Sequence, residues 1–320
     1  MGKYLIKRII IAIPTFILIT VMIFAMLKFT PGDPLLQMYD PELIRGMTPE
    51  QMDIIREEMG LNQSVIVQYF QWLVGLLGGN FGYSYQTLRP VRVMIGEALP
   101  NTLKLMGSSM LLAMLIGIPI GIYSAVRQYS KFDYVVTGLS FFMMALPAFF
   151  FGMLMIYIFS IQLRIFPTGG LRSLGRAPTL ANHLWHLALP SLMLAFKNSA
   201  VWVRYTRSSF LEVMNKDFIR TARSKGFKEK YILKTHAFPN AMGPIITIFG
   251  LTLPQLIVGA VITESIFAWP GLGRLMVNAI GQRDFPVVMG VTTLIAITVL
   301  FANILTDILY SVFDPRIRYE

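Results

Sequence analysis

The chain has 320 residues, of which 55% are hydrophobic and only 14% are charged, against about 25% charged residues in a typical soluble domain. This composition excludes a water-soluble globule, and the high apolar content also excludes a disordered chain. The absence of cysteine excludes disulfides, thiolate metal sites and thiol nucleophiles, while the excess of 28 Lys and Arg over 17 Asp and Glu needs its own explanation.

Long segments without Asp, Glu, Lys or Arg predict the membrane spans. A bilayer core about 30 Å thick is crossed by roughly 20 apolar residues in a helix. Five segments meet this requirement: 9–27, 105–126, 134–163, 237–263 and 285–306. A sixth segment, 187–203, is fourth in chain order and contains one charged residue, Lys197. The sequence therefore predicts an all-α integral membrane protein with six transmembrane helices. Pro147, near the middle of the third segment, predicts a kinked or tilted helix there, with two half-helices as the alternative.

The segment between the first two spans, residues 28–100, predicts two short helices outside the membrane. Thr48-Pro49-Glu50-Gln51 has the pattern of a capping box with a first-turn proline, and Gly60 follows as a stop signal. Ser64 is the expected N-cap of a second helix over 65–77, which is too short to cross a bilayer and suits the membrane surface because it carries Tyr69, Phe70 and Trp72. This helical extracytoplasmic insertion either receives a partner or caps the outer end of the bundle.

The distribution of Lys and Arg indicates the orientation. Sixteen Lys and Arg lie before the first span, between the second and third, between the fourth and fifth, and after the sixth, nine of them between the fourth and fifth. The two short segments on the other side hold five, and the segment 28–100 is discounted for its length. The positive-inside rule therefore predicts that both termini are cytoplasmic. The net charge of +11 is then mostly a topology signal, and nucleic-acid binding is not favoured, because no soluble basic domain is present.

The sequence contains no recognisable catalytic constellation. His183 and His186 are three residues apart, but no carboxylate pair accompanies them, and they are interpreted as interfacial residues. No Gly-Lys-Ser or Gly-Lys-Thr occurs, so the chain is not expected to hydrolyse ATP or to be an enzyme. An ion-coupled secondary carrier is the alternative from a different class, disfavoured because the middles of the spans lack carboxylates. Gly117 and Gly121 form a GxxxG pair, which predicts close helix packing within the chain or with another subunit.

The cytoplasmic loop over 204–236 carries nine Lys and Arg against three Asp and Glu, with apolar residues at helical spacing between them. A short amphipathic helix is expected to end at Gly226, because glycine is the preferred residue for a left-handed C-terminal turn. Pro239 is expected to mark the start of the fifth span. A cross-helix held between two spans in this way would transmit a push from a cytoplasmic partner into the membrane.

Three residues of this segment, Ala222, Gly226 and Pro239, occur in the register of the EAA loop of ABC-importer permeases. Only the skeleton of that pattern is shared, because four of its residues are replaced, by Arg220, Thr221, His236 and Phe238. The Arg-Thr-Ala-Arg-x-Lys-Gly form resembles instead the peptide-permease branch. Further motifs of that branch follow in the expected order: Lys7-Arg8, Thr30-Pro31-Gly32-Asp33-Pro34, Gly78-Gly79-Asn80-Phe81-Gly82, Leu99-Pro100-Asn101-Thr102-Leu103, Phe267-Ala268-Trp269-Pro270-Gly271-Leu272-Gly273, Arg283-Asp284-Phe285-Pro286-Val287 and Asp314-Pro315-Arg316. The sequence therefore resembles the B-type subunit of the oligopeptide, dipeptide and nickel permease family.

This resemblance implies the fold of a type I ABC importer permease. Residues 1–98 would hold the first transmembrane helix and the extracytoplasmic region, 99–310 a five-helix core with the coupling loop 204–236, and 311–320 a cytoplasmic tail. The implied function is that of a permease subunit which forms half of the translocation pathway for oligopeptides or dipeptides in a bacterial or archaeal cytoplasmic membrane. The implied partners are a C-type permease, two cytoplasmic ABC ATPases and an extracytoplasmic substrate-binding protein. No cofactor is expected on this chain, because ATP and Mg would bind to the ATPases.

The resemblance also assigns site residues. The helix that couples to the ATPase would comprise Arg220, Thr221, Ala222, Arg223, Lys225, Gly226 and Lys228, and the step from loop to helix would involve His236 and Pro239. The sequence assigns no pore-lining residue. A nickel or glutathione importer is the alternative within the same family, because the binding protein rather than the permease largely sets the selectivity.

Overall fold

The computed structural model describes residues 2–29, 45–58, 60–173, 175, 179–252, 256 and 261–313, and within these ranges the chain is helical and has no β-strand. The motifs at 30–34 and 314–316 and most of the expected tail at 311–320 lie outside the described residues. The helices are α1 (Gly2–Phe29), α4 (Pro49–Glu58), α5 (Val65–Leu77), α6 (Val91–Val126), α7 (Lys131–Ala145), α8 (Ala148–Met155), η1 (Ile156–Gln162), α9 (Leu180–Met214), α10 (Asp217–Ser224), α11 (Glu229–Tyr231), η2 (Ile232–Ala237), α12 (Phe238–Thr252), α14 (Val261–Ile266), α15 (Leu272–Gly281) and α16 (Phe285–Phe313).

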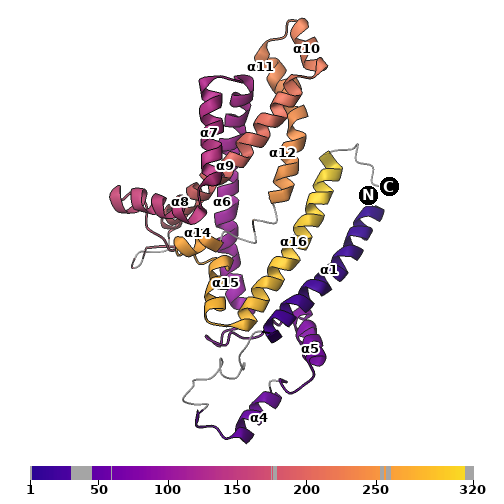
Figure 1. Ribbon diagram of the computed structural model, residues 1–320, viewed down its shortest axis with the longest axis vertical. Coiled ribbons are helices and arrows are strands. Elements are labelled where there is room, and N and C mark those ends of the chain that lie inside the picture. Colours follow the sequence, from indigo (N-terminus) through magenta and orange to yellow (C-terminus); the bar gives the residue numbers. More distant parts are fainter. Residues whose placement is uncertain are drawn as a thin grey trace.

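The long helices form one elongated bundle (Figure 1). α6 and α9 pack along each other, α12 packs on α9 and α16, and α16 packs on α1. The short helices α4 and α5 lie at the end of the bundle opposite to α10 (Figure 1). The predicted all-α architecture is confirmed.

The lengths of the apolar helices bear on the predicted number of spans. In the described part, α6 and the segment Phe285–Thr306 of α16 are each long and apolar enough to cross a membrane, and the pair α7 with α8–η1 is a third if it counts as one span. The fifth predicted segment, 237–263, contains α12 and α14, with residues 253–255 and 257–260 outside the description. The count of six transmembrane helices therefore stays a prediction.

The third predicted span is broken rather than kinked. α7 and α8 meet at 105° around Leu146 and Pro147, so the alternative of two half-helices is the one that the structure shows. Proline disfavours helical geometry in the residue before it, and Leu146 accordingly has φ −67° and ψ 127°. The break frees the carbonyl of Leu146, and the ammonium group of Lys197 on α9 donates to it at 3.0 Å. Lys197 is thus a cation at the negative end of α7, which explains how a span tolerates it.

Gly117 and Gly121 allow α6 to approach α9 closely. A Cβ at Gly117 would lie 2.5 Å from the Cβ of Trp202, and one at Gly121 would lie 2.7 Å from the Cβ of Thr206. Real side chains do not pack at such distances, so each position requires glycine. Of the two alternatives left open for the GxxxG pair, packing within the chain is confirmed.

The two helices predicted between the first spans are confirmed. The backbone N–H of Thr48 donates to the Gln51 side chain at 2.9 Å, and the N–H of Gln51 donates to the Thr48 hydroxyl at 3.4 Å, which is the reciprocal pattern of a capping box. Ser64 caps α5 by accepting from the N–H of Val67. Tyr69 and Trp72 of α5 pack on Phe24 of α1, so these two aromatic residues tie the insertion to the first helix.

Candidate coupling surface

The predicted coupling loop is a helical cap on one end of the bundle. α9 continues through Met214 before the chain turns into α10, which lies at the tip of the molecule beyond the ends of α6 and α7 (Figure 1). From Glu229 the chain is helical again through α11, η2 and α12. α10 is therefore held between two long helices and has one face against them and one face free.

The inner face of α10 is apolar and buried. Ile219 is fully buried and Ala222 nearly so, and both belong to the apolar cluster formed by Phe210 and Val213 of α9 with Ile232 of η2. Ala222, expected among the coupling residues, thus supports the helix from inside and is not on its free face. Packing of this kind fixes the position of α10 on α9 and η2.

Gly226 ends α10 as predicted. It has a φ of +77°, its N–H donates to the carbonyl of Arg223 at 2.9 Å, and the N–H of Phe227 donates to the carbonyl of Ala222 at 3.4 Å. These two bonds form a Schellman motif, in which a residue with positive φ terminates the helix. The sharp stop turns the chain back toward the bundle.

The outer face of α10 is basic and exposed. The Arg220 side chain is 81% exposed and lies 3.7 Å from Asp217, and Arg223 pairs with Glu229 at 2.8 Å. Exposed ion pairs contribute about 0–1 kcal/mol each, so they leave the arginines available to a partner. The remaining residues expected on the coupling helix, Thr221, Lys225 and Lys228, are exposed as well.

An aromatic cluster next to this basic face was not anticipated from the sequence. Phe227 and Tyr231 are both about half exposed, with their rings 5.1 Å apart, and the His236 ring lies 5.8 Å from that of Tyr231. Phe227 lies in the turn between α10 and α11, so helical spacing in the sequence did not predict this contact. We call the exposed residues Arg220, Thr221, Arg223, Lys225, Phe227, Lys228 and Tyr231 the coupling surface.

Pro239 lies at the start of α12, as its second residue, and the chain before it is already helical from Glu229. The point at which this segment enters the membrane stays a prediction. The turn before Pro239, η2, has π geometry, which is a common way for a helix to absorb a local mismatch. The side chain of Asn240 donates to the carbonyl of His236 at 2.7 Å and satisfies it.

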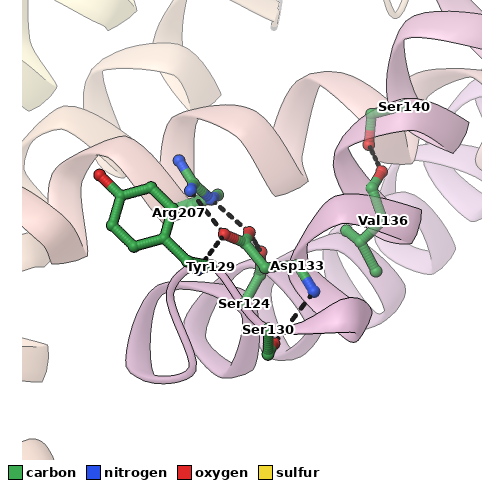
Figure 2. A network of polar contacts seen from close by, with 7 residues as sticks. All are labelled: Ser124, Tyr129, Ser130, Asp133, Val136, Ser140 and Arg207. Atoms are coloured by element: carbon green, nitrogen blue, oxygen red, sulfur yellow. Dashed lines mark hydrogen bonds and ion pairs between the residues drawn. The ribbon is translucent and has the colours of Figure 1, made fainter.

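A largely buried ion pair joins α6, α7 and α9 (Figure 2). The Asp133 carboxylate on α7 accepts two bonds from the Arg207 guanidinium on α9, at 2.7 and 2.8 Å, one from the Ser124 hydroxyl on α6, and one from the N–H of Tyr129 at 3.0 Å. Asp133 is only 3% exposed. The bonds from Arg207 hold the pKa of Asp133 well below its usual range, so the pair is ionised at physiological pH.

Two motifs from distant parts of the sequence meet at another joint. The Thr102 hydroxyl donates to the fully buried Glu264 carboxylate at 2.7 Å and accepts from the N–H of Leu272 at 2.8 Å. Glu264 also accepts from the N–H of Arg274 at 3.1 Å, and the Trp269 indole donates to the carbonyl of Asn101 at 2.9 Å. A carboxylate at the N-terminus of α15 is favoured by the helix dipole. Glu264 therefore has a structural role.

A third joint involves the residues that precede α16. The buried Asp284 carboxylate accepts from the Ser84 hydroxyl and from the N–H of Tyr85, which connects the motif at 283–287 to the turn after the motif at 78–82. Burial and the charge of Asp284 raise the pKa of the Tyr85 hydroxyl. Four of the motifs that supported the resemblance are thus paired in space, two by two.

The comparisons with known proteins agree with this architecture. Residues 117–319 match the family described as binding-protein-dependent transport system inner membrane component, and residues 1–106 match the N-terminal part described for such membrane components. The chain belongs to this family. It is 44% identical over 320 residues to the oligopeptide transport system permease protein AppB of Bacillus subtilis, with all of both chains covered. It is 36% identical over 341 residues to the dipeptide transport system permease protein DppB of Escherichia coli, again with all of both chains covered.

A solved structure shows the same fold. The MetNI methionine ABC transporter, in an inward-facing conformation, contains a chain that aligns with a TM-score of 0.56 at 16% identity, over 69% of this chain and 96% of the other. The fold is that of a type I ABC importer permease, and the expected family and fold are both confirmed. The chain is an inner membrane component of a binding-protein-dependent importer.

Proposed function

We propose that this chain is the B-type permease subunit of an ATP-driven importer for oligopeptides or dipeptides, and that it forms half of the translocation pathway. The full-length similarity to AppB and DppB, both named as peptide permeases, supports the substrate class. A second, C-type permease would supply the other half. ATP and Mg would bind to partner ATPases, and this chain would have no catalytic role of its own.

The observation that carries the proposal is the construction of α10. One face is anchored by Ile219 and Ala222, the end is fixed by the left-handed turn at Gly226, and the other face presents arginines beside exposed aromatic rings. Arginine and aromatic residues are typical of the centres of protein interfaces. A cytoplasmic ATPase is the partner that fits a rigid, basic and aromatic helix at this end of a permease.

Coupling would pass from α10 into the bundle through rigid contacts. A displacement of α10 moves the apolar cluster around Phe210 on α9, and the Asp133–Arg207 pair joins α9 to α7 and α6 (Figure 2). Three helices would therefore move as one unit when the ATPases close or open. The extracytoplasmic binding protein would deliver substrate at the opposite end, where α4 and α5 lie (Figure 1).

The arrangement of the termini supports the predicted orientation. α1 begins and α16 ends on the side of the bundle that carries α10 (Figure 1). If α10 faces the cytoplasm, as its positive charge favours, both termini are cytoplasmic and the protein lies in the cytoplasmic membrane.

The proposal is tested by uptake of a labelled short peptide in cells that lack this chain, with and without its restoration. Restored uptake that stops when ATP is depleted is the expected result. Uptake of radioactive nickel is measured in parallel, because restored nickel uptake without peptide uptake would replace the substrate. Peptide uptake that persists after ATP depletion would contradict the ATP-driven mechanism and favour the ion-coupled carrier.

A further inference from the structure

A cavity lies between α6, α9 and α12, in segments expected to cross the membrane. Its volume is about 130 Å³, which is ample for several water molecules. Apolar side chains that line it include Met106, Met110 and Trp202. Three polar side chains also line it, those of Ser109, Asn198 and Thr252. α9 packs directly on both other helices, so the cavity is enclosed by the chain's own bundle on these sides (Figure 1).

The side chain of Asn198 differs from the other two polar side chains that line the cavity. Ser109 donates to the carbonyl of Met106 and Thr252 to that of Phe249, each at 2.9 Å, so both hydroxyls are satisfied within their own helices. The carboxamide of Asn198, by contrast, has no hydrogen-bond partner in the part of the chain that the structure describes. Hydrocarbon cannot satisfy an amide, and polar side chains within membrane spans typically face water or a transported solute.

We propose that this cavity is a hydrated section of the translocation path and that Asn198 hydrogen-bonds the backbone of a passing peptide. A carboxamide offers two donors and one acceptor, which complement the carbonyl and the N–H of a peptide bond whatever the side chain. Met106 and Met110 beside it are flexible and polarisable, so they adapt to side chains of different shape. The site therefore selects for a peptide backbone and tolerates variation in sequence. The peptide contact rests on the proposed function, whereas the hydration of the cavity does not.

Hydration is tested by thiol labelling in the assembled importer. The chain contains no cysteine, so Asn198→Cys introduces its only thiol. A membrane-impermeant thiol reagent is expected to label this residue at least tenfold faster than Leu115→Cys, because a thiol ionises only where water reaches it. Leu115 is the matched control, since it lies on α6 with 61% of its surface exposed on an apolar face. Equal rates at the two positions, or no labelling of Asn198→Cys, would overturn the hydrated path.

The peptide contact is tested by uptake. Asn198→Leu keeps the size of the side chain but removes its hydrogen bonds, and it is expected to lower the initial rate of peptide uptake at least tenfold at normal membrane abundance. Asn198→Gln keeps the carboxamide and is expected to stay within about threefold of the wild type. Normal uptake by Asn198→Leu would overturn the contact. Failure of the wild-type chain to restore any peptide uptake would refute the proposed function and the contact together, while the labelling result would still decide hydration.

Discussion

Replacing Gly226 by alanine should loosen the end of α10 without disturbing any neighbour. A Cβ at this position meets no atom within 4 Å, so the only cost is that of the backbone, which has a φ of +77°. A left-handed conformation costs a residue with a Cβ about 1–2 kcal/mol. That cost corresponds to a rise of roughly 5- to 30-fold in the equilibrium constant for local opening.

Hydrogen exchange measures this opening directly. The N–H of Phe227 bonds to the carbonyl of Ala222 only while the Schellman motif is closed, so its exchange in lipid nanodiscs should accelerate by the same factor in Gly226→Ala. Gly226→Asn is the matched control, because asparagine adopts positive φ more readily, and it should accelerate exchange less. Unchanged exchange in the alanine variant, or equal exchange in both variants, would show that the positive φ of this residue does not control the opening of the end of α10.

Gly226→Pro extends the series to function. Proline fixes φ near −65° and removes the N–H that donates to Arg223 at 2.9 Å, so the helix stop cannot form. We expect peptide uptake to be lost while the subunit reaches the membrane in normal amounts. Normal uptake at normal abundance would show that the shape of this turn does not matter for coupling.

Three further predictions concern the joints of the bundle. Asp133→Asn should destabilise the chain by at most about 3–5 kcal/mol, seen as a lower melting temperature, because it leaves the partly buried Arg207 guanidinium without its carboxylate. Folding lowers the pKa of Asp133, so the contribution of its carboxylate to stability should be complete above the ordinary aspartate pKa of about 4 and should decline in more acidic solution. The difference in melting temperature between the wild type and Asp133→Asn should therefore become smaller in acid. A difference that does not change with pH would contradict this assignment. Gly117→Ala should lower the stability of the chain by about 1–3 kcal/mol, because the added methyl group overpacks against α9. Gly107→Ala is the control on the same helix, and it should not destabilise the chain because a Cβ there meets no atom within 4 Å. Equal melting temperatures of the two variants would argue against the close approach of α6 and α9. Glu264→Gln should lower the stability by about 1.5–3 kcal/mol, because it weakens the hydrogen bonds to a buried carboxylate. Glu97→Gln is the control, and it should cost less than about 1 kcal/mol because the ion pair of Glu97 with Arg89 is about half exposed. The reverse order of the two costs would refute the structural role of Glu264.

Local signals in the sequence predicted local structure well. The capping box at Thr48, the N-cap at Ser64 and the helix stop at Gly226 each depend on bonds between residues a few positions apart, and all three are confirmed. Pro147 located the break between α7 and α8. The angle of 105° between α7 and α8 was not predictable from the sequence. It depends on the residues packed around the break, including Lys197, which is 51 residues from Leu146 in the sequence and donates to its carbonyl.

The joints between helices needed the structure. Asp133 and Arg207 are 74 residues apart, and Thr102 and Glu264 are 162 residues apart, so no pattern in the sequence pairs them. The coupling helix was located from the sequence through its charge and its glycine. Which side of that helix faces inward, and therefore that Ala222 is buried, follows only from its packing on α9 and η2.

We propose that α10 carries the docking surface for a cytoplasmic ATPase. The most direct measurement is photo-crosslinking in the assembled importer, with a benzophenone amino acid placed at Arg220 on the coupling surface or at Val74, which is exposed on α5 at the other end of the bundle. We expect adducts between the ATPase and position 220 and none with position 74. Absence of an adduct from position 220 in a complex that retains its ATPase, or equal adducts from both positions, would contradict it.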